Sequence, residues 1–103
     1  MLQKAASKDE LQPDGIVAVD VAGQSVALYE LDGEVLATTN ICPHAFCRLD
    51  ENADVLDGAE VECSCHGSRF DIRTGSNINP PSSDPLKTFP VEVRGDEVFV
   101  DVG

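Results

Sequence analysis

The sequence is poor in basic and aromatic residues and contains no tryptophan. Its seven lysines and arginines are outnumbered by nineteen aspartates and glutamates, so the formal net charge at pH 7 is −12. This balance argues against nucleic acid as a partner, because phosphate binding needs lysine and arginine. No apolar run approaches the roughly 18 residues of a membrane span, and the first ten residues include no stretch typical of a signal peptide. We therefore expect a cytoplasmic protein that does not contact a membrane.

Helical periodicity is absent, and short segments alternate between apolar and polar residues instead. Asp32-Gly33 is a strong hairpin signal between two such segments. The length of 103 residues suits one domain with one core. The predicted fold is an antiparallel all-β domain, a basal sandwich or barrel with a lobe inserted at about residues 41–83. The expected strands cover residues 17–21, 25–31, 34–38, 61–63, 69–73, 91–93 and 98–102.

All four cysteines and both histidines lie in two short clusters. The first is Cys42-Pro43-His44-Ala45-Phe46-Cys47, and the second is Cys63-Ser64-Cys65-His66-Gly67-Ser68. Together they contain Cys-x-His and Cys-x-x-His, separated by 18 residues. A [2Fe–2S] centre of the Rieske type needs such a set, because two histidines replace two cysteines on one of its irons.

The chemistry of such a centre explains why it needs both residue types. Cys42 and Cys63 would bind one iron as thiolates, while His44 and His66 would bind the other as neutral imidazoles. The oxidised centre then has no net charge, so it accepts an electron more easily than a cluster with four thiolates. Because a bound imidazole can lose its second proton, reduction and protonation should be coupled at high pH.

Two other interpretations of these six residues stay open from the spacing alone. Two cysteines and two histidines also form zinc sites, which would make the chain a zinc-stabilised binding module. However, the spacing is less usual for zinc fingers, and no second histidine follows in a helical pattern. Alternatively, the four cysteines could form two disulfides in a secreted domain, which leaves both histidines beside cysteines by coincidence.

The clusters resemble the two cluster-binding loops of Rieske proteins, with a second loop that continues in the family pattern to Gly75. Residues 26–38, 56–62 and 87–91 resemble strands of the ferredoxins in bacterial aromatic-ring-hydroxylating dioxygenase systems, such as those for naphthalene and biphenyl. The resemblance extends from about Leu11 to the end. It implies the Rieske fold and one [2Fe–2S] cluster per chain. The implied ligands are Cys42, His44, Cys63 and His66.

Cys47 and Cys65 depart from the dioxygenase ferredoxins, most of which have no cysteine at these positions. The Rieske subunits of cytochrome bc complexes do have both, and there they form a disulfide. The resemblance therefore implies a Cys47–Cys65 disulfide, whereas the alternative is two free buried thiols. Such a bond would connect the loop tips, hold the loops together without the cluster and keep water away from it.

Four residues are expected around the cluster by the same resemblance. Ser68 matches a serine that donates to a bridging sulfide in the respiratory branch, while Phe70 replaces a tyrosine that donates to a cysteine ligand. One donor is kept and one is lost, so we predict a reduction potential between the branches, within about −150 to +300 mV. Pro80 and Pro81 match a proline loop that covers the cluster. The alternative for Ser68 is an ordinary turn hydroxyl, and for Phe70 it is a buried aromatic side chain. The two prolines could instead lie in a plain surface connector.

Ala45, Phe46 and Gly67 are expected near the loop tips, beside the histidines. An exposed apolar rim there would suit weak and short-lived docking, although Phe46 could equally be a core residue. The acidic surface would either steer the protein toward basic partner surfaces or only aid its solubility.

The sequence indicates an electron carrier rather than an enzyme. The cluster uses both histidines, which leaves none for a second iron site or a Ser-His-Asp triad. By resemblance, a flavin-containing ferredoxin reductase supplies electrons, and a terminal aromatic-ring oxygenase receives them one at a time. Both contacts would be transient, and the carrier is expected to be a monomer. The alternative is a Rieske subunit, or an excised domain, of a larger redox complex.

Overall fold

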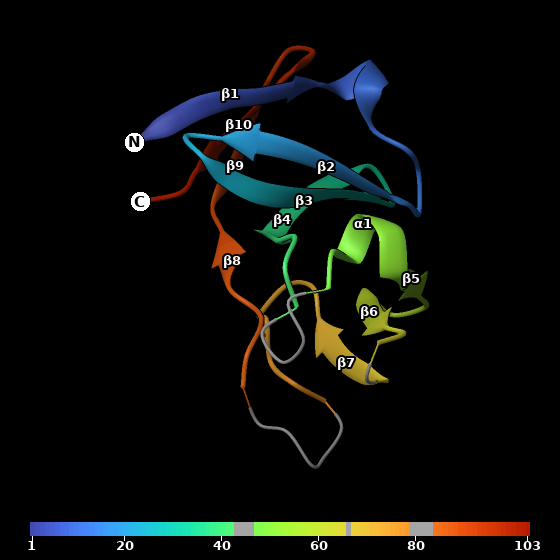
Figure 1. The fold of residues 1–103 in the computed structure, drawn as a ribbon. Helices are drawn as coiled ribbons and strands as arrows, with labels where there is room; N and C mark the ends of the chain where they lie inside the picture. Colours follow the sequence, from blue (N-terminus) through green and yellow to red (C-terminus); the bar gives the residue numbers. More distant parts are fainter. Residues whose placement is uncertain (43–46, 66, 79–83) are drawn as a thin grey trace.

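The computed structural model describes residues 1–42, 47–65, 67–78 and 84–103. Strands dominate these ranges and pair into three antiparallel sheets (Figure 1). The antiparallel all-β fold predicted from the sequence is confirmed. Nowhere in these ranges is there a helix with the length and apolar character needed to cross a membrane.

Two sheets, which we call the basal sheets, contain both ends of the chain. The first has the order β1-β10-β9 and the second β2-β3-β4-β8. The first consists of β1 (Leu2–Ser7), β9 (Val91–Arg94) and β10 (Glu97–Asp101). The second consists of β2 (Ile16–Val21), β3 (Gln24–Leu31), β4 (Glu34–Thr39) and β8 (Thr88–Phe89), and the 3-10 helix η1 (Lys8–Glu10) lies between β1 and β2 in the chain.

The third sheet belongs to a lobe inserted between β4 and β8, and Figure 1 shows it below the basal sheets. β4 and β8 are neighbours in one sheet, and the backbone N–H of Thr39 donates to the carbonyl of Lys87 at 2.8 Å. The insertion therefore leaves and rejoins the sheet at adjacent positions. The expected lobe, about residues 41–83, falls within it. Its elements are α1 (Leu49–Asn52), β5 (Ala53–Leu56), β6 (Glu60–Cys63) and β7 (Ser68–Asp71).

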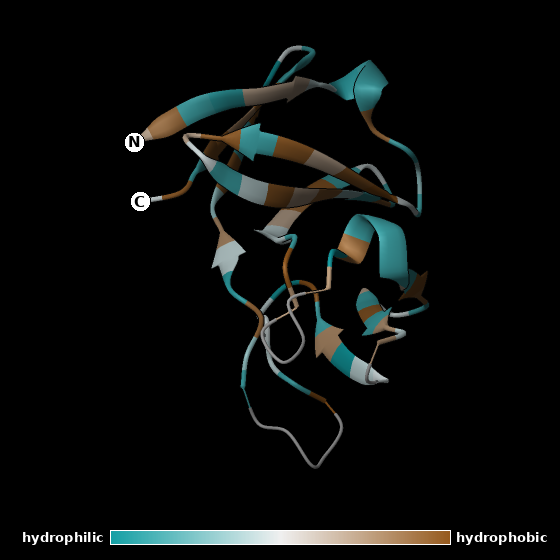
Figure 2. Ribbon diagram, viewed as in Figure 1, coloured by the Kyte–Doolittle hydropathy of each residue, from teal (hydrophilic) through white to brown (hydrophobic). Residues whose placement is uncertain are grey.

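Strand β3 separates two hydrophobic clusters because successive side chains of a strand point to opposite faces. Val26 and Leu28 join the cluster between the basal sheets, which also contains Phe89. Ala27 and Tyr29 join the cluster between β3 and the lobe. In Figure 2, β2 is mostly hydrophobic, whereas η1 and most of α1 are hydrophilic. Both faces of β3 are buried, so this strand fixes the lobe against the basal part.

Several elements differ from the sequence prediction. The sequence does not predict β1 or β5, because residues 2–7 alternate only weakly and β5 has only four residues. The pairing of β1 with β10 contains a bulge between Lys4 and Ala6. The strand expected at residues 69–73 ends at Asp71, whose side-chain oxygen accepts from the N–H of Arg73 at 2.8 Å and turns the chain. Val102, expected in the last strand, follows β10 and is nevertheless buried.

Candidate metal centre

Cys42 and Cys63 are the two predicted ligands that the structure describes, and both are completely buried. They belong to the cluster between β3 and the lobe, together with Leu49, Phe70 and Leu86. Neither cysteine takes part in the disulfide. The other two predicted ligands, His44 and His66, lie outside the described residues.

The first cluster loop has a firmly paired base. Ile41 and Arg48 form an antiparallel bridge, and the N–H of Cys42 donates to the carbonyl of Cys47 at 2.8 Å. The N–H of Leu49 donates to the carbonyl of Asn40 at 2.7 Å. Residues on the two sides of the loop thus form a short ladder, which places Cys42 beside Cys47. Pro43, Ala45 and Phe46 lie outside the described residues, so the predicted docking role of Ala45 and Phe46 stays a prediction.

The second cluster loop is a tight turn between β6 and β7. Cys63, the last residue of β6, is paired with Ser68, and its carbonyl accepts from the N–H of Gly67 at 2.8 Å. Gly67 has a φ of +69°, a conformation that glycine adopts at little cost. Ser68 is buried and Gly67 is exposed. These positions are compatible with a donor role for Ser68 and a contact role for Gly67, and both roles stay predictions.

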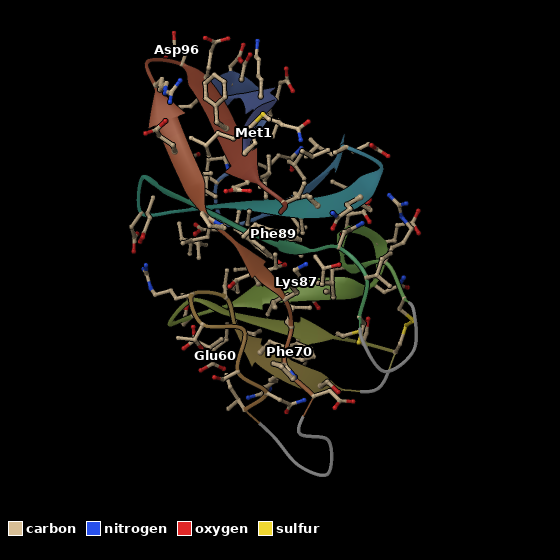
Figure 3. The ribbon with its side chains drawn as sticks, turned by 90° about the vertical axis from the view of Figure 1, so that its left-hand side faces the viewer. Met1, Glu60, Phe70, Lys87, Phe89 and Asp96 are labelled. Atoms are coloured by element: carbon tan, nitrogen blue, oxygen red, sulfur yellow. A yellow bond between two sulfur atoms is a disulfide. The ribbon has the colours of Figure 1, made fainter. Side chains whose placement is uncertain are left out.

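A disulfide joins Cys47 to Cys65 and thereby connects the first loop to the second, as the yellow bond in Figure 3 shows. The two Cα atoms are 6.7 Å apart, and Cys65 is exposed while Cys47 is half-buried. This is the pairing that the resemblance implied, rather than two free thiols. The bond uses the cysteines that are not predicted ligands and leaves the buried pair for a metal centre.

A third loop returns from the lobe toward β8, and its base is also fixed. Gly75 accepts from the N–H of Leu86 at 2.7 Å and donates to the carbonyl of Asp71 at 2.7 Å. The backbones are so close that a Cβ on Gly75 would lie 1.9 Å from the carbonyl oxygen of Leu86. Pro80 and Pro81, the predicted cover of the cluster, lie outside the described residues.

Phe70 is fully buried in the lobe, where Figure 3 labels it on β7. It lies in the same hydrophobic cluster as Cys42 and Cys63, which fits its predicted place near the centre. Its ring has no hydroxyl, so it cannot supply the donor that a tyrosine would offer here. The donor count behind the predicted intermediate potential therefore depends on Ser68.

Two polar groups near the centre could not be predicted from any pattern in the chain. Tyr29 is fully buried beside the lobe, and its hydroxyl lies 2.7 Å from the Oγ1 of Thr38. Burial raises the pKa of this phenol well above its ordinary value, although the hydrogen bond to Thr38 acts in the opposite direction. Asn40 is also fully buried, directly before the first loop. A strand-terminal asparagine is a common turn residue, so its burial could not be read from the chain.

The donor set fits an iron–sulfur centre. A buried thiolate without a counter-charge is costly, and binding to ferric iron removes that cost. Two buried cysteines at the bases of adjacent loops, surrounded by apolar side chains, offer this arrangement. Among the residues that the structure describes, no three His, Cys, Asp or Glu side chains gather into another metal site.

Comparisons with known proteins agree with this geometry. The sequence profile of the Rieske [2Fe-2S] domain matches residues 1–90. The ferredoxin component of the p-cumate 2,3-dioxygenase system of Pseudomonas putida is 49% identical over 82 residues, which cover 80% of this chain and 69% of that protein. The biphenyl dioxygenase ferredoxin subunit of Pseudomonas sp. (strain KKS102) is 42% identical over 98 residues, covering 95% of this chain and 89% of that protein.

Solved structures give the same result. The ferredoxin of carbazole 1,9a-dioxygenase from Nocardioides aromaticivorans IC177 has a TM-score of 0.88 at 34% identity, covering 97% of this chain and 96% of its own. A second match comes from a complex of reduced oxygenase and oxidised ferredoxin in carbazole 1,9a-dioxygenase, with a TM-score of 0.84 at 34% identity. It covers 96% of this chain and 91% of the matched chain.

Proposed function

Because the chain belongs to the Rieske [2Fe-2S] domain family, we propose that it holds one such cluster through two cysteines and two histidines. When bound, the cluster takes up and releases one electron. The buried sulfurs of Cys42 and Cys63 bind one iron, and the loop bases described above hold them in place. His44 and His66 complete the set. The family match favours iron over the zinc alternative.

The protein is an electron carrier, the ferredoxin component of an aromatic-ring dioxygenase system, and not the oxygenase itself. The observation that carries this conclusion is the match to ferredoxin components of such systems, over most of both chains. The related complex of a ferredoxin with its oxygenase supports electron delivery to a terminal oxygenase. A flavin-containing reductase as donor, a monomeric state and a cytoplasmic location complete the proposal.

Reconstitution tests this function. The purified holoprotein is combined with an NADH-dependent ferredoxin reductase and a terminal ring-hydroxylating oxygenase, and substrate turnover is followed. We expect turnover only when all three components are present, with one electron taken up per chain in a redox titration. Turnover that is equally fast without this protein would contradict the proposal.

Cysteine variants test the ligand assignment in the same assay. Cys42→Ser should abolish the visible chromophore and the turnover, because an alcohol is a poor ligand for ferric iron in place of a thiolate. Cys47→Ser is the matched control, since it removes a sulfur of the disulfide but no proposed ligand. It should keep the colour but shorten its lifetime. A normal spectrum in Cys42→Ser would show that the ligand assignment is wrong.

A further inference from the structure

Asn40 is an enclosed polar residue just before the first cluster loop. It directly follows β4, two positions before Cys42, and is fully buried. Its backbone N–H donates to the carbonyl of Ser25 at 2.9 Å, and its carbonyl accepts from the N–H of Leu49 at 2.7 Å. The main chain of Asn40 thus connects β3 of the second basal sheet to the first residue of α1.

The side chain of Asn40 repeats this connection. Its Nδ2 donates to the Oγ of Ser25 at 3.2 Å and to Oδ1 of Asp50 at 2.7 Å. Its Oδ1 accepts from the backbone N–H of Asp50 at 2.9 Å. The amide therefore uses both its donor and its acceptor on the far side of the cluster loop. We call the side chains of Ser25, Asn40, Arg48 and Asp50 the Asn40 clasp.

Arg48 completes the clasp from the other end of the loop. Its Nε donates to Oδ1 of Asp50 at 3.2 Å, and its Nη2 donates to Oδ2 at 3.1 Å. Burial of Asp50 acts to raise its pKa, but the hydrogen bonds from Asn40 and Arg48 outweigh it, so the pKa of this carboxyl lies below its ordinary value. Asp50 is thus an ionised acceptor shared by an amide and a guanidinium.

The clasp determines where the first loop sits. Arg48 is bridged to Ile41, and the next pair of the same ladder joins the N–H of Cys42 to the carbonyl of Cys47. A shift of Asp50 relative to Asn40 would therefore move the ladder that holds both cysteines. Because β3 anchors the clasp through Ser25, the loop is held relative to the basal part as well as within the lobe.

We propose that Asn40 is a positioning residue for the cluster: its amide, paired with Asp50, fixes the first loop and with it the sulfur of Cys42. This inference rests on the proposed function, because it assumes that Cys42 is a ligand. Only a group with one donor and one acceptor fits both contacts to Asp50. A carboxylate at position 40 would face the carboxylate of Asp50 and lose the donated hydrogen bond.

A set of exchanged variants tests the pairing. In Asn40→Asp, hydrogen exchange of the holoprotein, followed by mass spectrometry on peptides covering residues 36–50, should accelerate about tenfold or more, because a buried polar contact is lost. The electron paramagnetic resonance signal of the reduced cluster should also broaden. The double variant Asn40→Asp with Asp50→Asn restores one donor and one acceptor between the positions, so both signals should return toward those of the wild type.

Two controls keep the outcome clear. Gln12→Glu adds the same charge at an exposed position far along the chain from the loop and should leave both signals unchanged. Peptides of β9 and β10 report whether the basal part remains folded. Unchanged exchange and line width in a folded Asn40→Asp protein would overturn the proposal, as would a double variant no better than the single one. Neither readout needs a reductase or an oxygenase, so the proposal can fail independently of the electron-transfer function.

Discussion

The buried hydroxyl of Tyr29 makes the stability of the fold depend on pH in the alkaline range. This is the only tyrosine of the chain, and it lies fully buried between β3 and the lobe. Burial disfavours the phenolate, so the folded pKa is raised while the unfolded chain titrates near the ordinary value of about 10. Above about pH 10 the phenol of Tyr29 loses its proton in the unfolded chain but keeps it in the folded protein, so the free energy of unfolding falls.

We therefore predict that the tyrosinate absorbance band develops only as the protein unfolds. An alkaline titration of the holoprotein should show this band rising together with the loss of the sheet signal in circular dichroism. In Tyr29→Phe the fall in stability above about pH 10 should be smaller, because that linked proton is absent. A tyrosinate band that appears in fully folded protein near pH 10 would contradict the burial of this side chain.

Single residues also show how far the site could be predicted from the sequence. The spacing of the cysteines and histidines identifies the candidate centre, because ligand chemistry restricts which residue types can serve. Asn40 and Ser25 carry no such signature. They are fifteen positions apart, and their hydrogen bond exists only because β3 and the end of β4 are neighbours in a sheet. This hydrogen bond depends on the register in which β3 and β4 pair, and a sequence pattern does not predict that register.

At the scale of elements, the three loops of the lobe share one design, in which the base is fixed by hydrogen bonds. The third loop depends on the closest backbone approach, that of Gly75 to Leu86. Gly58, in the turn between β5 and β6, has the same φ of +80° but no atom within 4 Å of its would-be Cβ. Alanine at either position would pay for the left-handed backbone conformation, but only alanine at Gly75 would also clash with Leu86.

We predict that Gly75→Ala lowers the free energy of unfolding by at least about 2 kcal/mol more than Gly58→Ala does. The shared left-handed conformation cancels in this comparison, and the contact of the new methyl group with the Leu86 carbonyl remains. Denaturant unfolding of both holoproteins measures the difference, and the lifetime of the visible colour should fall with it. Equal losses for the two variants would show that the close approach is relieved at little cost.

Elements with strong alternation were predictable, whereas those that depend on partners were not. Strands β2, β9 and β10, in which valines alternate with other residues, lie where the sequence indicated, because period-two patterns with flanking turn residues are strong signals. β5 has the charged Asp54 within four residues, and α1 is a single turn, so neither has a pattern long enough to detect. Both are stabilised by the packing of Leu49 and Val61 in the lobe.

On the surface of the protein, most of the few positively charged side chains are paired with carboxylates. Within the described part of the chain, five of the seven basic side chains form ion pairs with carboxylates, as Arg69 does with Glu62 and Lys4 with Glu97. The pairs are exposed, so each adds little to stability. Because most basic side chains are paired, a partner that approaches this protein meets a net charge of −12 and few unpaired positive side chains.

We predict that the second-order rate of electron transfer to a partner with a basic docking face falls about tenfold between low salt and about 0.5 M salt. Stopped-flow measurement with the oxygenase at several ionic strengths tests this. The reduction potential of the protein, measured in the same buffers, is the control that separates steering from a change in driving force. A rate independent of salt would mean that the acidic surface serves solubility alone.

The insertion of the lobe between hydrogen-bonded neighbours has a consequence for how such proteins diversify. Thr38 of β4 and Thr88 of β8 are paired in the sheet. The segment between them, which carries the cluster loops, therefore begins and ends at adjacent strands and can be replaced by another segment without moving either strand. The recipient sheet keeps its own pairing, since β4 and β8 meet whether the excursion is long or short. A chimera that carries loops of one lineage on the framework of another is thus topologically simple. The mixture in this chain, with disulfide-bridged loops on a ferredoxin framework, is what modular exchange of that kind would produce.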